Sequence, residues 1–436
     1  MKDFKIKHYD YGRTQQRKQG RRAVVVTLLM TAAALAVGWF AYPPVYEMVT
    51  GYEALLSQRQ DPDPSQPVTP QPEPSSVSSS QEEPGGEEMA VFPQSAAYLP
   101  PEVVEDKALR EAALASMKQK GMDGVIFDLK DQQGMVRYQS GLELVESNRA
   151  QAERAYPLPE VIEEIRQAGL VPVGRVYAFK DRTATAHMYE SAVKYMDSPV
   201  NWIDDSKANG GKPWLNPNDK EAQDYIIALV EEAAGNGLGA ILLDGVQFPE
   251  GVSLNLATYG NTGTLDKSAI LADFLARARG AGEGAGGQVA TTVNLISAAG
   301  LSNVRYGDDV GKVLEAAGLA VVEVMPEQFG SGVTTETLTL SSPALAPYDT
   351  VSQALAACRE VLFPGSGDED PDQEDTPVET PVLAAVVQAY TSQSLSESAN
   401  KVYGPQDIQD QVRAVQEVGI QRVFYLDPTG GYEAIG

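Results

Sequence analysis

Short apolar runs that each end at a polar residue recur along the chain after about residue 89. The clearest is Gly239–Asp244, where Ala, Ile and two Leu lead directly to a carboxylate and then to Gly245. A run of this kind is typical of a buried parallel strand, and α/β barrels place their functional groups at the carboxyl ends of such strands. Similar runs cover residues 89–93, 124–128, 171–177, 289–295, 320–325, 382–390 and 422–427. The pattern therefore predicts eight buried strands.

Segments with helical spacing of apolar residues lie between these runs. They cover residues 108–120, 158–168, 221–235, 271–279, 310–317, 351–361 and 408–418. Strands that alternate with helices pair in parallel through right-handed crossovers, and eight such units are typical of a (β/α)8 TIM barrel.

A doubly wound open sheet is the alternative architecture. Against it, no glycine-rich phosphate loop follows the first strand. The Gly282–Gly287 segment has the G-x-G-x-x-G spacing, but it follows a predicted helix and precedes a predicted strand. A dinucleotide site needs the reverse order, so we interpret this segment as a flexible loop.

The N-terminal region has the composition of a membrane anchor. Residues 1–22 form a basic tail with eight Lys or Arg against two Asp, and residues 23–46 contain no charged residue. This apolar stretch is long enough to cross a bilayer as a helix, and the positive-inside rule keeps the basic tail in the cytoplasm. A cleaved signal peptide is the alternative, but Trp39, Phe40 and Tyr42 resemble an interfacial aromatic belt. We expect a single-pass signal anchor in the cell membrane, which contacts the lipid bilayer through residues 23–46 and leaves the barrel extracellular.

Two further segments have the composition of disordered chain. Residues 47–88 form a predicted stalk, of which 61–88 are rich in Pro, Ser, Gln and Glu and lack Lys, Arg and aromatic residues. Such a composition buries too little apolar surface to fold. The barrel is therefore expected over residues 89–436, interrupted by an acidic disordered insertion at about 364–380.

Charge and rare residues exclude several classes of function. The net charge of −26 argues against nucleic acid, whose binding depends on clustered Lys and Arg. Cys358 is the single cysteine, so no intrachain disulfide can form. Because His8 and His187 are the two histidines, a Ser-His-Asp triad and a His-rich zinc site are disfavoured, and we expect neither a metal nor a cofactor.

Polar residues at the strand ends would converge on one rim if the barrel closes. Glycoside hydrolysis needs two carboxyl groups beside the scissile bond, and Asp244 and Glu323 are the catalytic candidates. The candidates for substrate binding are Asp128, Lys130, Asp131, Lys180, Asp181, Trp214, Gln247, Asn294 and Gln388.

Several of these residues also have a structural interpretation. Asp128 would equally suit a buried ion pair with Lys130 or Arg175, and the adjacent Lys180 and Asp181 would suit a salt bridge within a loop. Trp214 would suit local packing as well as stacking on a sugar ring.

Five motifs together resemble a known family. They are Phe127–Asp131 with Gly134–Tyr138, Gly174–Asp181, Trp214–Pro217, Leu243–Pro249 and Gln411–Gly419. In order and spacing they are similar to the putative glycosyl hydrolase domain family, whose barrels are related to α-amylase-like enzymes. The resemblance covers nearly all of residues 89–436, and it implies a (β/α)8 fold and cleavage of carbohydrate.

The chain departs from the family pattern at the rim. Gln247 stands where the family has arginine, Asn294 where it has an aspartate, and Leu426 where it has tryptophan. A histidine-bearing stretch of the family has become a segment with two acids, Glu323 and Glu327. An amide cannot exchange a proton as an acid does, so either Glu323 or Glu327 replaces the missing acid or the domain no longer cleaves.

Three hypotheses follow. The first is a glycoside hydrolase that acts on a cell-envelope or extracellular polysaccharide, with Asp244 as nucleophile or stabiliser and Glu323 as acid. The second is a catalytically inactive barrel that binds carbohydrate or acts as a scaffold. The third is a purely structural envelope protein.

Overall fold

The computed structural model describes residues 91–260, 264–295, 304–335, 337–364, 382–432 and 435. The predicted basic tail, membrane helix, stalk and acidic insertion lie outside these residues. Within the described part of the chain, no helix combines the length and the apolar character needed to span a bilayer.

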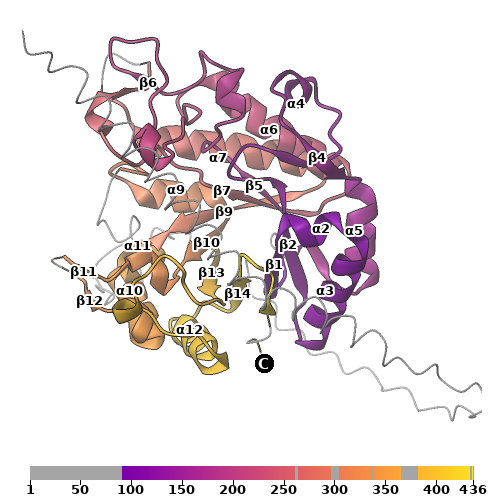
Figure 1. Ribbon diagram of the computed structural model, residues 1–436, viewed down its shortest axis with the longest axis vertical. Helices are drawn as coiled ribbons and strands as arrows, with labels where there is room; N and C mark the ends of the chain where they lie inside the picture. Colours follow the sequence, from indigo (N-terminus) through magenta and orange to yellow (C-terminus); the bar gives the residue numbers. More distant parts are fainter. Residues whose placement is uncertain are drawn as a thin grey trace, which may run out of the picture. The chain divides into compact units, whose positions relative to one another are not determined.

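Eight parallel strands form a closed barrel (Figure 1). Around the ring they are β1 Ser95–Leu99, β2 Gly124–Lys130, β5 Val171–Tyr177, β7 Ala240–Asp244, β9 Gln288–Asn294, β10 Leu319–Glu323, β13 Val382–Gln388 and β14 Arg422–Leu426. Strand β1 pairs with both β14 and β2, which closes the ring. The predicted (β/α)8 barrel is confirmed, and the open sheet is excluded.

The predicted position of the first strand was wrong. We expected it at residues 89–93, but β1 begins at Ser95. Pro93 lacks the N–H that a central strand donates to its neighbour, and it lies against Gly124, where a Cβ would approach its Cγ to 2.4 Å. The strand therefore starts only after Pro93, in a short run that ends before Pro100.

Helices cover the outside of the ring (Figure 1). They are α2 Pro101–Glu105, α3 Lys107–Gln119, α4 Glu143–Ser147, α5 Leu158–Gln167, α6 Lys220–Gly235, α7 Lys267–Gly284, α9 Val310–Ala317, α10 Pro347–Ala357, α11 Arg359–Leu362 and α12 Pro405–Glu417. Asp106, Asp219, Asp266 and Asp309 each cap a helix by accepting a backbone N–H of its first turn. An acceptor at this position satisfies an otherwise unpaired donor, which fixes where α3, α6, α7 and α9 begin.

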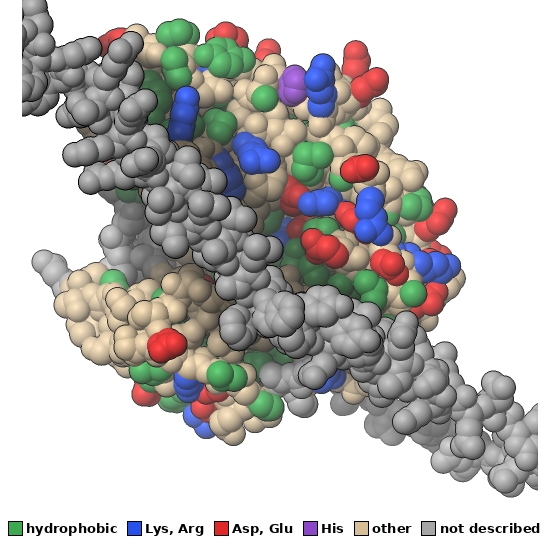
Figure 2. All heavy atoms as spheres, in the orientation of Figure 1, with side chains coloured by type: hydrophobic (Ala, Val, Ile, Leu, Met, Phe, Trp, Pro, Cys, Tyr) green, Lys and Arg blue, Asp and Glu red, His purple; other side chains and the backbone are tan. Residues whose placement is uncertain are grey.

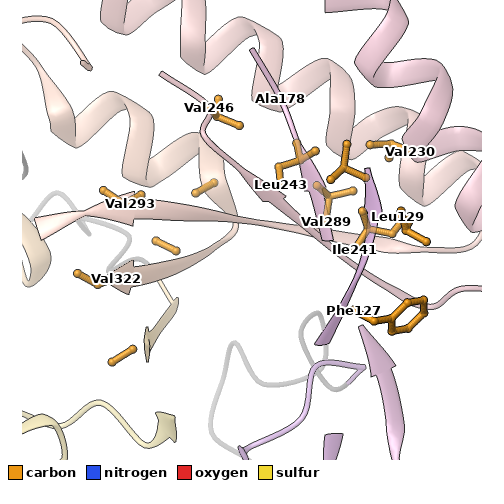
Figure 3. Close-up of a cluster of buried hydrophobic side chains, with 14 of the residues drawn as sticks. Phe127, Leu129, Ala178, Val230, Ile241, Leu243, Val246, Val289, Val293 and Val322 are labelled. Carbon is orange, nitrogen blue, oxygen red and sulfur yellow. The ribbon is translucent and has the colours of Figure 1, made fainter. Parts of the chain in front are cut away.

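Apolar side chains of the strands fill two separate layers. One set fills the inside of the ring and includes Ile126, Val173, Leu242 and Val321. The alternate positions pack outward against the helices, as Figure 3 shows for Phe127 and nearby side chains. Because successive side chains on a strand face opposite sides, the inward register fixes which polar strand-end residues face the barrel mouth.

Long insertions follow several strands at their carboxyl ends. They contain β3 Val136–Tyr138 and β4 Gln151–Tyr156 after β2, β6 Lys194–Tyr195 after β5, β8 Ala257–Thr258 after β7, and the hairpin of β11 Gly332–Thr334 and β12 Thr339–Ser341 after β10. These connections belong to the rim where barrel enzymes carry their sites. The long connections between the barrel elements therefore lie around one end of the barrel.

Surface charges are largely paired locally. Acidic and basic side chains lie interleaved on the right-hand part of the face in Figure 2. Lys220 and Arg277 both pair with Asp224, and Arg413 pairs with Asp410.

Candidate functional site

Asp244 and Glu323 lie at the carboxyl ends of β7 and β10, with β9 between them. They continue the inward-facing positions of Leu242 and Val321. Two strand spacings separate their backbones by about 10 Å, and side chains that converge on the barrel axis approach more closely. The sequence-predicted pair therefore shares the barrel mouth.

Asp244 is held from two sides. The hydroxyl of Thr292 donates a hydrogen bond of 2.8 Å to its Oδ1. Its Oδ2 lies 3.6 Å from Nη1 of Arg175, and the residue is 9% exposed. A neighbouring cation favours the charged form of a carboxyl group, so this arrangement suits an ionised Asp244.

Glu323 has the opposite electrostatic environment. Burial and then the negative charge of Asp244 raise its pKa to about 7, although Arg305 and hydrogen bonds with Gln328 and Asn294 oppose the shift. Because both residues continue inward-facing positions of their strands, the charge of Asp244 acts on Glu323 across the barrel interior. Close to neutral pH, Glu323 can therefore either hold or release a proton.

Asn294 takes part in this arrangement as a support. Its side chain is a hydrogen-bond partner of Glu323, and its backbone N–H donates to the Tyr306 hydroxyl at 2.9 Å. The residue that departs from the family pattern at the fifth strand thus contacts the acid of the sixth.

Glu327 has other contacts. Its carboxylate accepts hydrogen bonds from the hydroxyls of Tyr390 and Ser394. Burial raises the pKa of Glu327, but the hydrogen bonds from Ser394, Tyr390 and Ser392 outweigh this effect and hold it below its ordinary value. A carboxyl group that remains ionised cannot act as an acid at neutral pH, so of the two sequence candidates Glu323 has the suitable environment.

Asp128 faces the interior but is fully engaged by protein groups. Its Oδ1 accepts from Nε of Arg175 at 2.7 Å, and its Oδ2 accepts from the Tyr98 hydroxyl at 2.8 Å. Of the two pairings that the sequence left open, the structure forms the one with Arg175.

Lys130 and Asp181 form a buried ion pair away from solvent. Their charged atoms are 2.9 Å apart and both side chains are 0% exposed. Lys130 also donates to the backbone carbonyls of Tyr177 and Ala178. This geometry leaves neither side chain open to a substrate.

Replacing Lys130 by Met should destabilise the fold strongly. The variant leaves the Asp181 carboxylate buried without its cation, and breaking a buried ion pair from one side costs about 3–5 kcal/mol. Guanidinium unfolding measures this loss. Lys107→Met is the control, because Lys107 is 69% exposed and its pairs with Glu111 and Glu164 each contribute at most about 1 kcal/mol. Equal losses in the two variants would contradict the structural role of Lys130.

Of the other sequence candidates, Asp131 and Trp214 are buried and Lys180 is partly exposed. Asp131 accepts hydrogen bonds from Arg137 and from the turn that follows it. Trp214 is 2% exposed and donates to Asp204, which also lies 3.5 Å from Nζ of Lys180. Trp214 therefore has no ring face open to a sugar.

Two glutamines complete the set of predicted residues. Gln388 is 0% exposed, and it exchanges hydrogen bonds with Gln411 and accepts the backbone N–H of Glu327. Gln247 lies just after the turn at Gly245, which has a φ of +65°, and it is 7% exposed. Gln388 therefore joins helix α12 to the segment that follows β10, whereas Gln247 lies three positions after Asp244, just beyond the end of β7.

Sequence reasoning named Arg175 only as a partner of Asp128, and it missed three other groups around the pair, Tyr98, Thr292 and Tyr306. Tyr98, Arg175, Thr292 and Tyr306 all contact the carboxylates or their supports. Thr292 could have been identified from the sequence, because it lies two positions before Asn294 and so faces the same side of β9. Within the described residues, no group of three or more His, Cys, Asp or Glu side chains could hold a metal ion.

Comparison with known proteins gives both a family and a fold. A family model described as "putative glycosyl hydrolase domain" matches residues 96–432. The PgaB (BpsB) glycoside hydrolase domain from Bordetella bronchiseptica is similar in structure, with a TM-score of 0.53 and 14% identity over 77% of this chain and 94% of that one. A hypothetical protein from Ruminiclostridium thermocellum is 26% identical over 45% of this chain and 96% of its own, with a TM-score of 0.40. Among curated proteins, none matches the chain.

Proposed function

The chain belongs to the putative glycosyl hydrolase domain family, and we propose that it hydrolyses glycosidic bonds of a cell-envelope or extracellular polysaccharide at the barrel mouth. The observation that carries this proposal is the contrast between Asp244 and Glu323. Asp244 lies beside the Arg175 guanidinium, whereas the pKa of Glu323 is raised by burial and by Asp244 to about 7. Two nearby carboxyl groups whose environments separate their protonation states are what glycoside hydrolysis requires.

In this reaction the two groups have different tasks. Glu323 transfers its proton to the glycosidic oxygen of the leaving sugar as the bond to the anomeric carbon breaks. Asp244, as a carboxylate, acts as the nucleophile at the anomeric carbon or stabilises the positive charge that develops there. Water supplies the hydroxyl group of the new reducing end, and its proton restores Glu323.

The proposed location is the outer face of the cell membrane. The uncharged stretch at residues 23–46, preceded by a basic tail, supports a membrane anchor with a cytoplasmic N-terminus. A polymer in the cell envelope would then be within reach of the barrel. Digestion of intact cells by an added protease should remove the barrel if it is extracellular, and protection from digestion would contradict this location.

A barrel that binds glycan without cleaving it is the second candidate. Asn294 favours it, because it replaces the acid that the family places on the fifth strand. In that case Glu323 and Asp244 would bind sugar hydroxyls instead of performing chemistry.

One experiment separates the two functions. We expect the purified protein to release reducing ends from at least one member of a panel of cell-wall glycans and α-glucans. The double variant D244N/E323Q should retain binding in affinity electrophoresis and release none. Glycan binding by the native protein without any release would support the second candidate, and the absence of both would contradict a carbohydrate function.

A further inference from the structure

Arg175 lies at the centre of the charged cluster inside the barrel. Its Cζ is 4.3 Å from the ring centroid of Tyr98 and 4.8 Å from that of Tyr177. Its side chain is 11% exposed. Stacking against two aromatic rings restricts the guanidinium plane, and a desolvated cation between rings is stabilised by their electron-rich faces.

The two carboxylates beside Arg175 are held unequally. Nε donates to Asp128 at 2.7 Å, but the nearest contact of Nη1 with Asp244 is 3.6 Å, too long for a hydrogen bond. The Tyr98 hydroxyl occupies the second oxygen of Asp128. Asp128 therefore has no free oxygen, whereas Oδ2 of Asp244 has a nearby cation without a hydrogen bond.

We propose that Tyr98, Asp128 and Arg175 form a positioning clamp for Asp244. In this clamp, Asp128 draws the guanidinium toward itself, so that Arg175 keeps Asp244 ionised without blocking its Oδ2. A direct hydrogen bond between Arg175 and Asp244 would lower the basicity of the carboxylate and cover the oxygen that the substrate needs. The inference rests on the proposed function for its purpose, but the electrostatic effect can be measured without substrate.

The protonation states within the clamp agree with this role. Burial lowers the pKa of Arg175, but nearby negative charge, led by Asp128, raises it well above its ordinary value, so the residue stays cationic. Burial and Asp128 raise the pKa of Tyr98, so its hydroxyl keeps the proton that it donates.

Other titratable groups also act near Asp244. Burial is the main reason why the pKa values of Glu323, Tyr177 and Tyr306 are raised, and the charge of Asp244 adds to each shift. Since both tyrosines keep their protons at neutral pH, Glu323 is the one of these three groups that changes its charge near pH 7. The experiment therefore follows the two carboxyl groups together, because the apparent pKa values of interacting groups belong to the pair.

The experiment follows the Asp244 and Glu323 carboxyl carbons by NMR across pH, with signals assigned by D244N and E323Q. In Asp128→Asn, the charge of Arg175 is no longer shared and one negative neighbour is lost. We expect the lower apparent pKa of the pair to fall by about one unit or more. In Arg175→Gln the cation is lost, and the same pKa should rise by a similar amount.

Arg110→Gln is the matched control. Arg110 is a buried arginine that pairs with Glu164 on the outer helices, so its loss should lower stability without moving either pKa of the pair. Opposite shifts in Asp128→Asn and Arg175→Gln support the clamp. If Arg175→Gln does not fold, Asp128→Asn alone decides, and an unchanged lower pKa in that variant overturns the proposal.

The kinetic readout separates this inference from the proposed function. Where hydrolysis is detected, Asp128→Asn should lower kcat about tenfold, leave KM within about twofold, and move the acidic limb of the pH profile to lower pH. If the titrations of the Asp244 and Glu323 carboxyl groups shift in the variants but the protein cleaves no glycan, the clamp is supported and the proposed hydrolase function is refuted. Hydrolysis with unmoved titrations would refute the clamp alone.

Discussion

Asp244→Asn should lower the rate of glycan hydrolysis by about a thousandfold or more while the protein remains folded. The amide keeps the shape of the side chain and can still contact Thr292, but it carries no negative charge to attack or stabilise the anomeric carbon. The release of reducing ends at a fixed enzyme concentration measures the loss. A variant that retains more than about a tenth of native activity would remove Asp244 from the chemistry.

Asp244→Asn should also change the pKa of Glu323. Because the charge of Asp244 is one cause of the raised pKa of Glu323, the pKa of Glu323 should fall from about 7 in Asp244→Asn. It should stay above its ordinary value, since burial remains. Asp427→Asn is the control, as Asp427 is also a buried aspartate beyond a barrel strand but accepts its hydrogen bonds from Thr429 in a local turn. That variant should change neither the rate nor the pKa of Glu323.

The barrel was predictable because its signals are local. Each buried strand is an apolar run, and each run is followed by a segment with helical spacing, so alternation and parallel pairing follow from the sequence alone. The first strand was misplaced because an apolar run before Pro93 resembles the true strand after it. Pro93 itself was the available signal, because it lacks the N–H that a central strand donates, and its contact with Gly124 agrees that the earlier run does not continue the ladder.

The carboxylate pair was predictable for a similar reason. Asp244 and Glu323 each end a strand, and a closed ring brings strand ends together. Their protonation states were not predictable, because these depend on which partners from other strands face the same interior. Arg175 approaches Asp244 from the neighbouring strand, and Lys130 turns to a fully buried Asp181 instead of the rim. The register across strands and the depth of burial determine the partners of Asp244 and of Lys130. Neither property can be predicted from the sequence of a single segment.

Glu323→Gln should lower the rate about 10²- to 10⁴-fold on natural glycans, because a general acid contributes about that much. Aryl glycosides, whose leaving groups need little protonation, should lose far less. The native rate should fall as pH rises through about 7, where Glu323 loses its proton, and this limb should vanish in the variant. Glu327→Gln should keep the limb, because Glu327 is already ionised there. A limb that survives in Glu323→Gln would assign the acid to another group.

The pH dependence of the free energy of unfolding provides an independent test of the pKa of Glu323. Its pKa of about 7 in the native protein lies above the ordinary value of 4.5, so the folded state binds this proton more tightly than the unfolded chain. The resulting stabilisation is complete below pH 4.5 and is lost as pH rises through about 7. Glutamine removes this dependence. Denaturant unfolding should therefore show Glu323→Gln gaining stability relative to the native protein between these pH values, and a constant difference would mean that Glu323 titrates normally.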